Sequence, residues 1–149
     1  MARNKIALIG AGNIGGTLAH LAQRRRPDAP VRTGWSVPEQ LDRRDFDRPD
    51  APWLVAVFTS AKCETCSSVV EVAGPLESKA VAFHEVEAGA RKDLHDRYAI
   101  EAVPMVLLVD AVGVVRSHHL GPVSATHLWG SLAELRQPGS IPDGCSAGD

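Results

Sequence analysis

The sequence predicts an α/β fold in which a central mixed β-sheet is flanked by helices and preceded by an N-terminal appendage. Between residue 36 and about residue 137, apolar runs of strand length alternate with helix-like stretches. The order along the chain is β–α–β–α–β–β–α, and this alternation is typical of a sheet covered by helices. The chain has 149 residues, 44% of them hydrophobic, which is enough for one domain with a buried core.

The domain opens with a weak helical signal and a strong strand signal. Residues 37–46 ("VPEQLDRRDF") carry Pro38 near their start, where proline suits the first turn of a helix, and they predict a short helix. Residues 52–60 ("PWLVAVFTS") form an unbroken apolar run, which is typical of a strand covered on both faces.

A helix is predicted to begin at Cys63 and to continue through residues 63–76 ("CETCSSVVEVAGPL"). Gly74 and Pro75 should end or kink this helix, because proline lacks an amide donor and clashes with the preceding turn. The side chains expected to reach the core are Val69, Val70 and Val72.

The rest of the domain continues the alternation. The predicted elements are a strand at residues 79–87, a polar helix at 90–100, a strand at 103–110, its hairpin partner at 114–121 and a closing helix at 124–136. Strands joined through a helix are expected to pair in parallel, whereas the hairpin adds an antiparallel edge. In the closing helix we expect Ser124 as the N-cap and one apolar face formed by Leu128, Leu132 and Leu135.

Four segments follow from these patterns. They are a Gly-rich appendage at residues 1–23, a linker at 24–35 ("RRRPDAPVRTGW"), the domain at 36–137 and a flexible tail at 138–149. The formal net charge of −2 gives no reason to expect a nucleic acid partner, and we expect a monomer. Few cysteines and no convincing secretory signal at the start predict a cytoplasmic protein.

Two of the three cysteines, Cys63 and Cys66, form a Cys-x-x-Cys pair where the apolar strand meets the next helix. Unpaired amides and a partial positive charge at a helix N-terminus stabilise a thiolate, which is the reactive form of cysteine. Lys62 adds to this effect and Glu64 opposes it. Cys66 is expected to be the more buried thiol, so that Cys63 attacks a disulfide and Cys66 resolves the product. Cys145, in the tail, is expected to be a free thiol.

Two other interpretations of the pair are open. A structural zinc site needs about four ligands, but the chain has no second Cys-x-x-Cys motif, and the adjacent His118 and His119 would point to opposite faces of a strand. We therefore expect no metal. A purely structural pair would leave the domain as a binding module. The remaining histidines, His84, His95 and His127 among them, are expected to be exposed or satisfied by neighbours.

Over residues 36–137 the chain resembles the thioredoxin superfamily. The features that carry the resemblance are "LVAVFTSAKCETC", the strand "AVPMVLLVD", the turn "DAVGVV" and the closing "LGPVSATHLW". The resemblance implies a thioredoxin-like fold and a thiol–disulfide oxidoreductase, acting on protein disulfides with an unidentified electron donor or acceptor and without a bound cofactor. It also implies a cis peptide bond at Pro104, and a substrate-binding role for Val103 and Pro104 beside the dithiol.

The dithiol departs from the family pattern at several positions. Lys62 stands where the best-known members have Trp, and Glu64 and Thr65 replace the enclosed Gly-Pro. Val57 stands where many members carry a buried acid that assists proton transfer to the second thiol. The sequence therefore leaves the direction of the redox reaction open, and the rival function is a redox-silent adaptor with the same fold.

The appendage resembles the start of NAD-dependent malate and lactate dehydrogenases. Gly10, Gly12 and Gly15 have the dinucleotide-fingerprint spacing, after an apolar strand pattern and before a helical one. The resemblance ends near residue 23, and no second strand ending in an acid follows, so we expect no NAD. The open alternatives are a fusion remnant without function, or a membrane anchor over residues 6–23, which three arginines follow.

Overall fold

The computed structural model describes residues 34–140. The chain divides into the units Met1–Trp35 and Ser36–Asp149, and the second unit holds the sheet. The glycine fingerprint, the proposed anchor at residues 6–23, nearly all of the 24–35 linker and Cys145 lie outside the described residues. Among residues 34–140, no helix has both the length and the apolar character needed to cross a bilayer.

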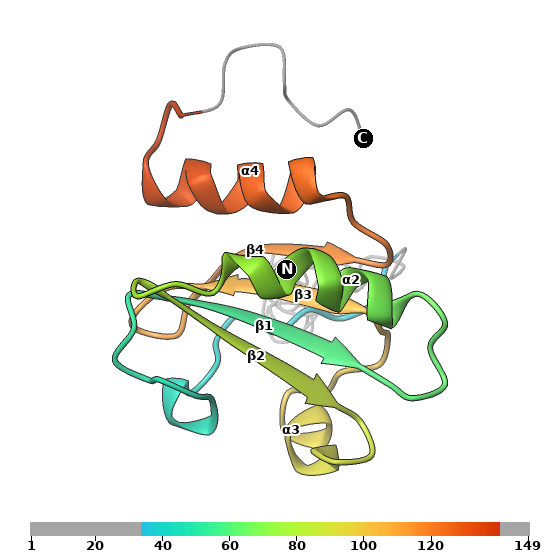
Figure 1. Ribbon diagram of the computed structural model, residues 1–149. Coiled ribbons are helices and arrows are strands. Elements are labelled where there is room, and N and C mark those ends of the chain that lie inside the picture. The colour runs from blue at the N-terminus through green and yellow to red at the C-terminus, as the bar shows by residue number, and fades with distance from the viewer. Residues whose placement is uncertain (1–33, 141–149) are drawn as a thin grey trace, which may run out of the picture. The chain divides into compact units, whose positions relative to one another are not determined.

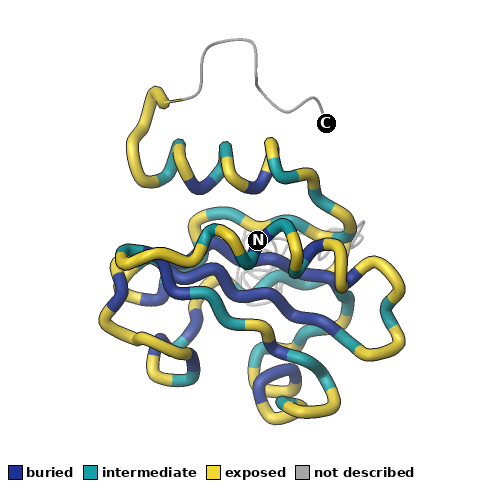
Figure 2. The backbone as a smooth tube through the Cα atoms, in the orientation of Figure 1, coloured by how far each residue is buried: buried dark blue, intermediate teal, exposed yellow. Residues whose placement is uncertain are grey.

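The core of the domain is a mixed four-stranded sheet with strand order β2-β1-β3-β4 (Figure 1). Its strands are β1 (Trp53–Thr59), β2 (Val81–Glu87), β3 (Met105–Val109) and β4 (Val115–Leu120). The predicted α/β class, with a mixed sheet flanked by helices, is therefore confirmed. Both central strands, β1 and β3, are buried along nearly their whole length (Figure 2), which fits their uninterrupted apolar sequences.

The pairing of β3 differs from the sequence expectation. β1 and β2 are parallel, as predicted, and β3 and β4 form the predicted antiparallel hairpin, but β3 also runs antiparallel to β1. The helix between β2 and β3 is α3 (Lys92–Arg97), whose six residues extend about 9 Å, against about 23 Å for the seven residues of β2. Because α3 is too short to return the chain to the start of the sheet, β3 begins at the end where β2 stops.

Helices cover both faces of the sheet (Figure 1). On one face α2 (Cys66–Ala73) and α4 (Ala125–Arg136) pack on β1 residues such as Val55 and Val57. On the opposite face, α3 and the 3-10 helix η1 (Arg43–Asp45) cover Ala56 and Phe58. A second 3-10 turn, η2 (Gly74–Leu76), follows α2 where Gly74 and Pro75 were expected to end it. Successive residues of β1 thus serve two separate apolar cores.

The closing helix α4 has the predicted cap and apolar face. The Ser124 hydroxyl accepts a hydrogen bond from the His127 amide, which satisfies one of the free donors of the first turn. Leu128 and Leu132 are buried, and Leu135 packs beside them. The exposed Trp129 also donates its indole N–H to the Val72 carbonyl at 2.8 Å, so that α4 is fixed to α2 by a polar contact as well.

The helix predicted for residues 37–46 is wrong. Glu39 and Leu41 instead lie extended beside the β3–β4 turn: the Val115 amide donates to the Glu39 carbonyl at 2.9 Å, and the Leu41 amide to the Gly113 carbonyl at 2.8 Å. Tertiary pairing overrides the weak local signal from Pro38. Within residues 37–46, helical structure is confined to η1, whose N-cap Asp42 accepts a hydrogen bond from the Arg44 amide.

Gly113 provides a test of this pairing. Its φ of +90° is in the region that favours glycine, and a Cβ there would lie 2.1 Å from the Leu41 carbonyl oxygen. We expect Gly113→Ala to lower the free energy of unfolding by about 3 kcal/mol or more, because strain adds to a backbone clash. Gly121→Ala is the control, since its φ is +78° but no atom lies within 4 Å of the added Cβ. Urea denaturation of both variants would measure the difference, and equal losses would contradict the role of the Leu41 contact.

Candidate functional site

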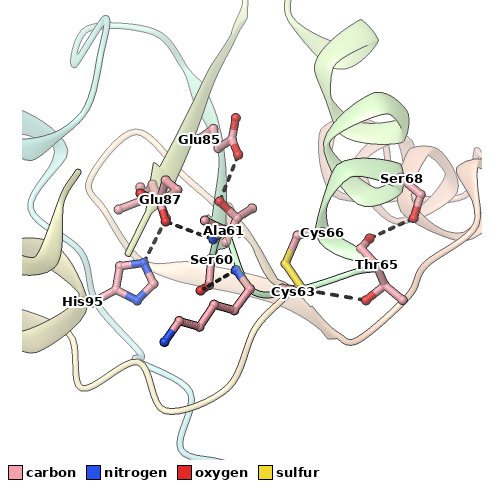
Figure 3. Close-up of a disulfide and its surroundings, with 12 residues drawn as sticks. Ser60, Ala61, Cys63, Thr65, Cys66, Ser68, Glu85, Glu87 and His95 are labelled. Atoms are coloured by element: carbon pink, nitrogen blue, oxygen red, sulfur yellow. Dashed lines mark hydrogen bonds between the residues drawn. A yellow bond between two sulfur atoms is a disulfide. The ribbon is translucent and has the colours of Figure 1, made fainter. Parts of the chain in front are cut away.

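The site lies where β1 ends and α2 begins. Cys63 and Cys66 are joined by a disulfide, with their Cα atoms 5.5 Å apart (Figure 3). Residues 60–65 connect Thr59, the last residue of β1, to Cys66, the first residue of α2. This connection contains a turn in which the Cys63 amide donates to the Ser60 carbonyl at 3.0 Å. The end of the central strand β1 therefore fixes the position of the dithiol closely.

The helix begins later than the sequence predicts. Cys63 lies in the turn, and the first helical residue is Cys66, with Thr65 as its N-cap. The residues between β1 and Cys66 form turns instead: the Cys63 amide donates to the Ser60 carbonyl, and the first hydrogen bond of the helix runs from the Val69 amide to the Thr65 carbonyl. The Thr65 side chain makes no cap hydrogen bond, and the first turn of α2 holds no acid. The amides at the start of α2 therefore keep their electrostatic effect on an anion nearby.

The two sulfur-bearing residues differ in exposure as predicted. Cys66 is 4% exposed, whereas Cys63 is only partly covered and has its sulfur 3.8 Å from the Thr65 hydroxyl. Cys66, Val69 and Ala73 follow at i, i+3 and i+7, so that Cys66 continues the buried stripe of α2. Once reduced, Cys63 would be the thiol that a large reactant can reach.

The three residues predicted to flank the thiols are all exposed. Lys62, Glu64 and Thr65 surround Cys63 at the surface. Within residues 34–140, the hydrogen bond of Lys62 uses its backbone amide, which donates to the Ser60 hydroxyl at 3.3 Å. Its ammonium group therefore remains available beside Cys63, although salt will screen so exposed a charge.

Sheet register brings Val103 and Pro104 to the same end of the sheet as the dithiol. Met105 is paired with Phe58, so Pro104 continues past the pair toward the end of β1. The Val103–Pro104 peptide bond is cis, Pro104 is buried and Val103 is partly exposed. The Pro104 carbonyl accepts from the Gly121 amide at 2.9 Å, which adds the end of β4 to this neighbourhood. The substrate-binding roles of Val103 and Pro104 stay predictions.

Val57 lies where the family resemblance implies a buried acid. It is completely buried in the apolar core beneath α2, with Val55, Val69 and Val106. Its partner across the strand pair is Glu85, which is exposed and accepts a hydrogen bond from the Thr59 hydroxyl at 2.9 Å. The position itself therefore offers no group that could take a proton from Cys66.

Sequence reasoning missed Glu87. Its carboxylate accepts hydrogen bonds from three backbone amides, those of Ala61, Gly89 and Ala90. Figure 3 shows Glu87 beside Ala61. These bonds, with the Gly89 and Ala90 amides first, hold the pKa of Glu87 below its ordinary value. An acid that ends a strand and is followed by a small-residue turn ("EAGA") is the signal that could have revealed it.

His95 and His119 are at least partly buried. His95 is 8% exposed, and its Nε2 lies 2.8 Å from the Val86 carbonyl, so it is a satisfied core residue. On β4, burial lowers the pKa of His119, and the neighbouring His118 and His127 lower it further. Among residues 34–140, no three acid, histidine or cysteine side chains converge as metal ligands.

The comparisons with known proteins bear on the fold and on the appendage. A point-mutant thioredoxin from Halobacterium salinarum NRC-1 superposes with a TM-score of 0.54 at 18% identity, over 68% of this chain and 95% of that one. A structure described as that of a malarial protein gives a TM-score of 0.51 at 15% identity, over 56% of this chain and 96% of that one. The fold is thioredoxin-like. No protein-family model matches the chain.

A separate likeness concerns a short stretch alone. Over 22 residues the chain is 91% identical to the malate dehydrogenase of Francisella tularensis subsp. novicida (strain U112), and to that of Francisella novicida. This stretch is 15% of the chain, which spans only 7% of the length of those enzymes. The likeness therefore concerns a fragment and says nothing of the thioredoxin-like domain.

The exposure difference between the thiols leads to a labelling prediction. In reduced protein carrying Cys145→Ser, iodoacetamide should modify Cys63 roughly tenfold faster than Cys66, because only Cys63 is accessible and reactivity follows exposure and thiolate content. Mass spectrometry of peptides after timed labelling measures both rates. Cys63→Ser and Cys66→Ser variants report each remaining thiol alone. Equal rates, or faster labelling of Cys66, would contradict the assignment.

Proposed function

We propose that this chain is a thiol–disulfide oxidoreductase whose reactive pair is Cys63 and Cys66. The observation that carries the proposal is the placement of this pair in a thioredoxin-like fold, with one accessible and one buried sulfur at the start of α2. Free amide donors at a helix N-terminus and the adjacent Lys62 ammonium favour a thiolate at Cys63 over a neutral thiol. Few cysteines suit a reducing compartment, and we place the protein in the cytoplasm.

The proposed reaction proceeds in two exchanges. The Cys63 thiolate attacks one sulfur of a substrate disulfide, so that a mixed disulfide forms and the other substrate sulfur leaves as a thiolate. Cys66 then loses its proton and attacks the Cys63 sulfur, which closes the Cys63–Cys66 disulfide and releases the second substrate thiolate. The substrate gains two electrons from the dithiol, and a donor dithiol restores them. The same steps run in reverse oxidise a substrate dithiol.

The substrate is a protein segment that can approach an open surface. Val103 offers backbone groups at the end of the sheet that carries Cys63, and Pro104, bonded through its carbonyl to the Gly121 amide, shapes the surface on which the segment lies. Lys62 favours partners with a carboxylate near the reacting disulfide, because an exposed ammonium attracts an approaching anion. No bound organic cofactor is needed, since the sulfur atoms themselves carry the electrons.

The apolar side chain at Val57, which supplies no proton acceptor, favours one rival function, a redox-silent binding module. Without an acid under Cys66, the proton of the resolving thiol must leave toward solvent past Cys63, and the second exchange is correspondingly slow. In the rival case the pair would stay in one redox state and only help to hold the start of α2. The two functions differ in whether the pair titrates reversibly.

Redox titration and trapping test the proposed function. Over a series of glutathione ratios, the Cys63–Cys66 pair should convert reversibly between dithiol and disulfide, as read by mass after thiol labelling. Cys66→Ser should leave the mixed disulfide unresolved, so that partner proteins remain attached to Cys63 until a reductant is added. Cys63→Ser is the matched control and should retain no partner. A pair that keeps one state across all ratios would exclude the oxidoreductase and support the binding module.

A further inference from the structure

Glu87 connects two loops that leave the sheet side by side. It ends β2, and its partner in the parallel register is Thr59, which ends β1. The Ala88 amide donates to the Thr59 carbonyl at 2.9 Å, which extends the ladder one step past the strands. The β1–α2 turn, which carries Cys63, and the β2–α3 connection therefore start next to each other.

The Glu87 carboxylate then joins these loops. Its Oε1 accepts from the Ala61 amide at 3.0 Å, across the strand pair, and its Oε2 accepts from the Gly89 and Ala90 amides, each at 2.8 Å. The Arg91 amide donates to the Glu87 backbone carbonyl at 2.8 Å, so the β2–α3 connection folds back on Glu87. Hydrogen bonds to an ionised acceptor are the strong ones, and three of them converge here.

The cross-strand bond acts close to the reactive sulfur. Ala61 is two residues before Cys63, and the turn between them is closed by the Cys63 amide on the Ser60 carbonyl at 3.0 Å. Because this turn is short and closed by a hydrogen bond, a displacement of Ala61 also displaces Cys63. The bond from the Ala61 amide is thus the direct link between the Glu87 carboxylate and the turn that leads to the dithiol.

We propose that Glu87 is a positioning residue for the dithiol: its carboxylate holds the turn at residues 60–62 against the β2–α3 connection and so presents Cys63 for in-line attack. This role rests on the proposed oxidoreductase function. It does not place Glu87 in contact with substrate, and it requires no proton transfer by the carboxylate.

Gly89 gives an independent way to disturb the same contact. A Cβ on Gly89 would lie 3.0 Å from Oε2 and 3.5 Å from Oε1 of Glu87. The φ of Gly89 is outside the left-handed region, so alanine fits the backbone and only the carboxylate must give way. Gly89→Ala therefore crowds the acid without removing its charge, whereas Glu87→Gln removes the charge and leaves a single good acceptor oxygen.

The test compares two reactions of Cys63 in reduced protein. Disulfide exchange with oxidised glutathione needs the sulfur in line with its target, whereas alkylation by iodoacetamide needs only an accessible thiolate. We expect Glu87→Gln to slow exchange about tenfold, since small misplacements of a reacting atom cost this much or more. Alkylation should change less than twofold. Gly89→Ala should reduce exchange in the same direction.

Glu85→Gln is the matched control, because Glu85 is an acid of the same strand whose hydrogen bond goes to the Thr59 side chain. It should leave both rates near those of the unmodified protein. Hydrogen exchange of the Ala61 amide should quicken in Glu87→Gln and stay unchanged in Glu85→Gln. Unchanged exchange with glutathione in Glu87→Gln, or equal loss in all three variants, would overturn the positioning role. An unmodified protein that does not exchange with glutathione would overturn the proposed function, and the positioning role with it.

Discussion

The end of β1 is the constraint on which the site depends. β1 is paired on both edges, to β2 and β3, and is buried from Leu54 to Thr59, so the strand has no freedom to shift along the sheet. A slip of one residue would exchange the two apolar cores that its alternate side chains fill. Because Cys63 lies only a short turn beyond Thr59, the register of β1 also determines where the accessible sulfur of the disulfide lies.

The other parts of the site reach the dithiol through the same ladder. The pairing of Phe58 with Met105 positions Pro104, and the pairing of Thr59 with Glu87 positions the acid that binds the Ala61 amide. Parallel and antiparallel neighbours thus meet at one end of β1 for different reasons. β2 ends there because it is parallel, and β3 begins there because α3 is too short to carry the chain back.

Much of the fold was predictable because long apolar runs and a helix N-cap are local patterns that tertiary contacts did not override. Uninterrupted apolar runs predicted β1 and β3, and Ser124 predicted the start of α4. The misses have physical causes. Pro38 suggested a helix where pairing with Gly113 imposes an extended chain, and the antiparallel entry of β3 depends on the length of α3, which the pattern overestimated. The disulfide partners and their unequal burial followed from spacing, but the turns that precede Cys66 and delay the start of α2 have no signal in that spacing.

The contacts of Glu87 could not be predicted from the sequence. Its importance comes from three amides contributed by two loops, and one of these, Ala61, is 26 residues away along the chain. Such amide clusters also change the electrostatics of the site. The carboxylate of Glu87 is offset by its amide donors and Val57 contributes no charge, so the exposed Glu64 is the neighbouring group that opposes the amides of α2 and Lys62 in stabilising a Cys63 thiolate. In the proposed exchange, the apolar Val57 therefore favours the first step, in which Cys63 attacks, and leaves Cys66 without a nearby base for the second step.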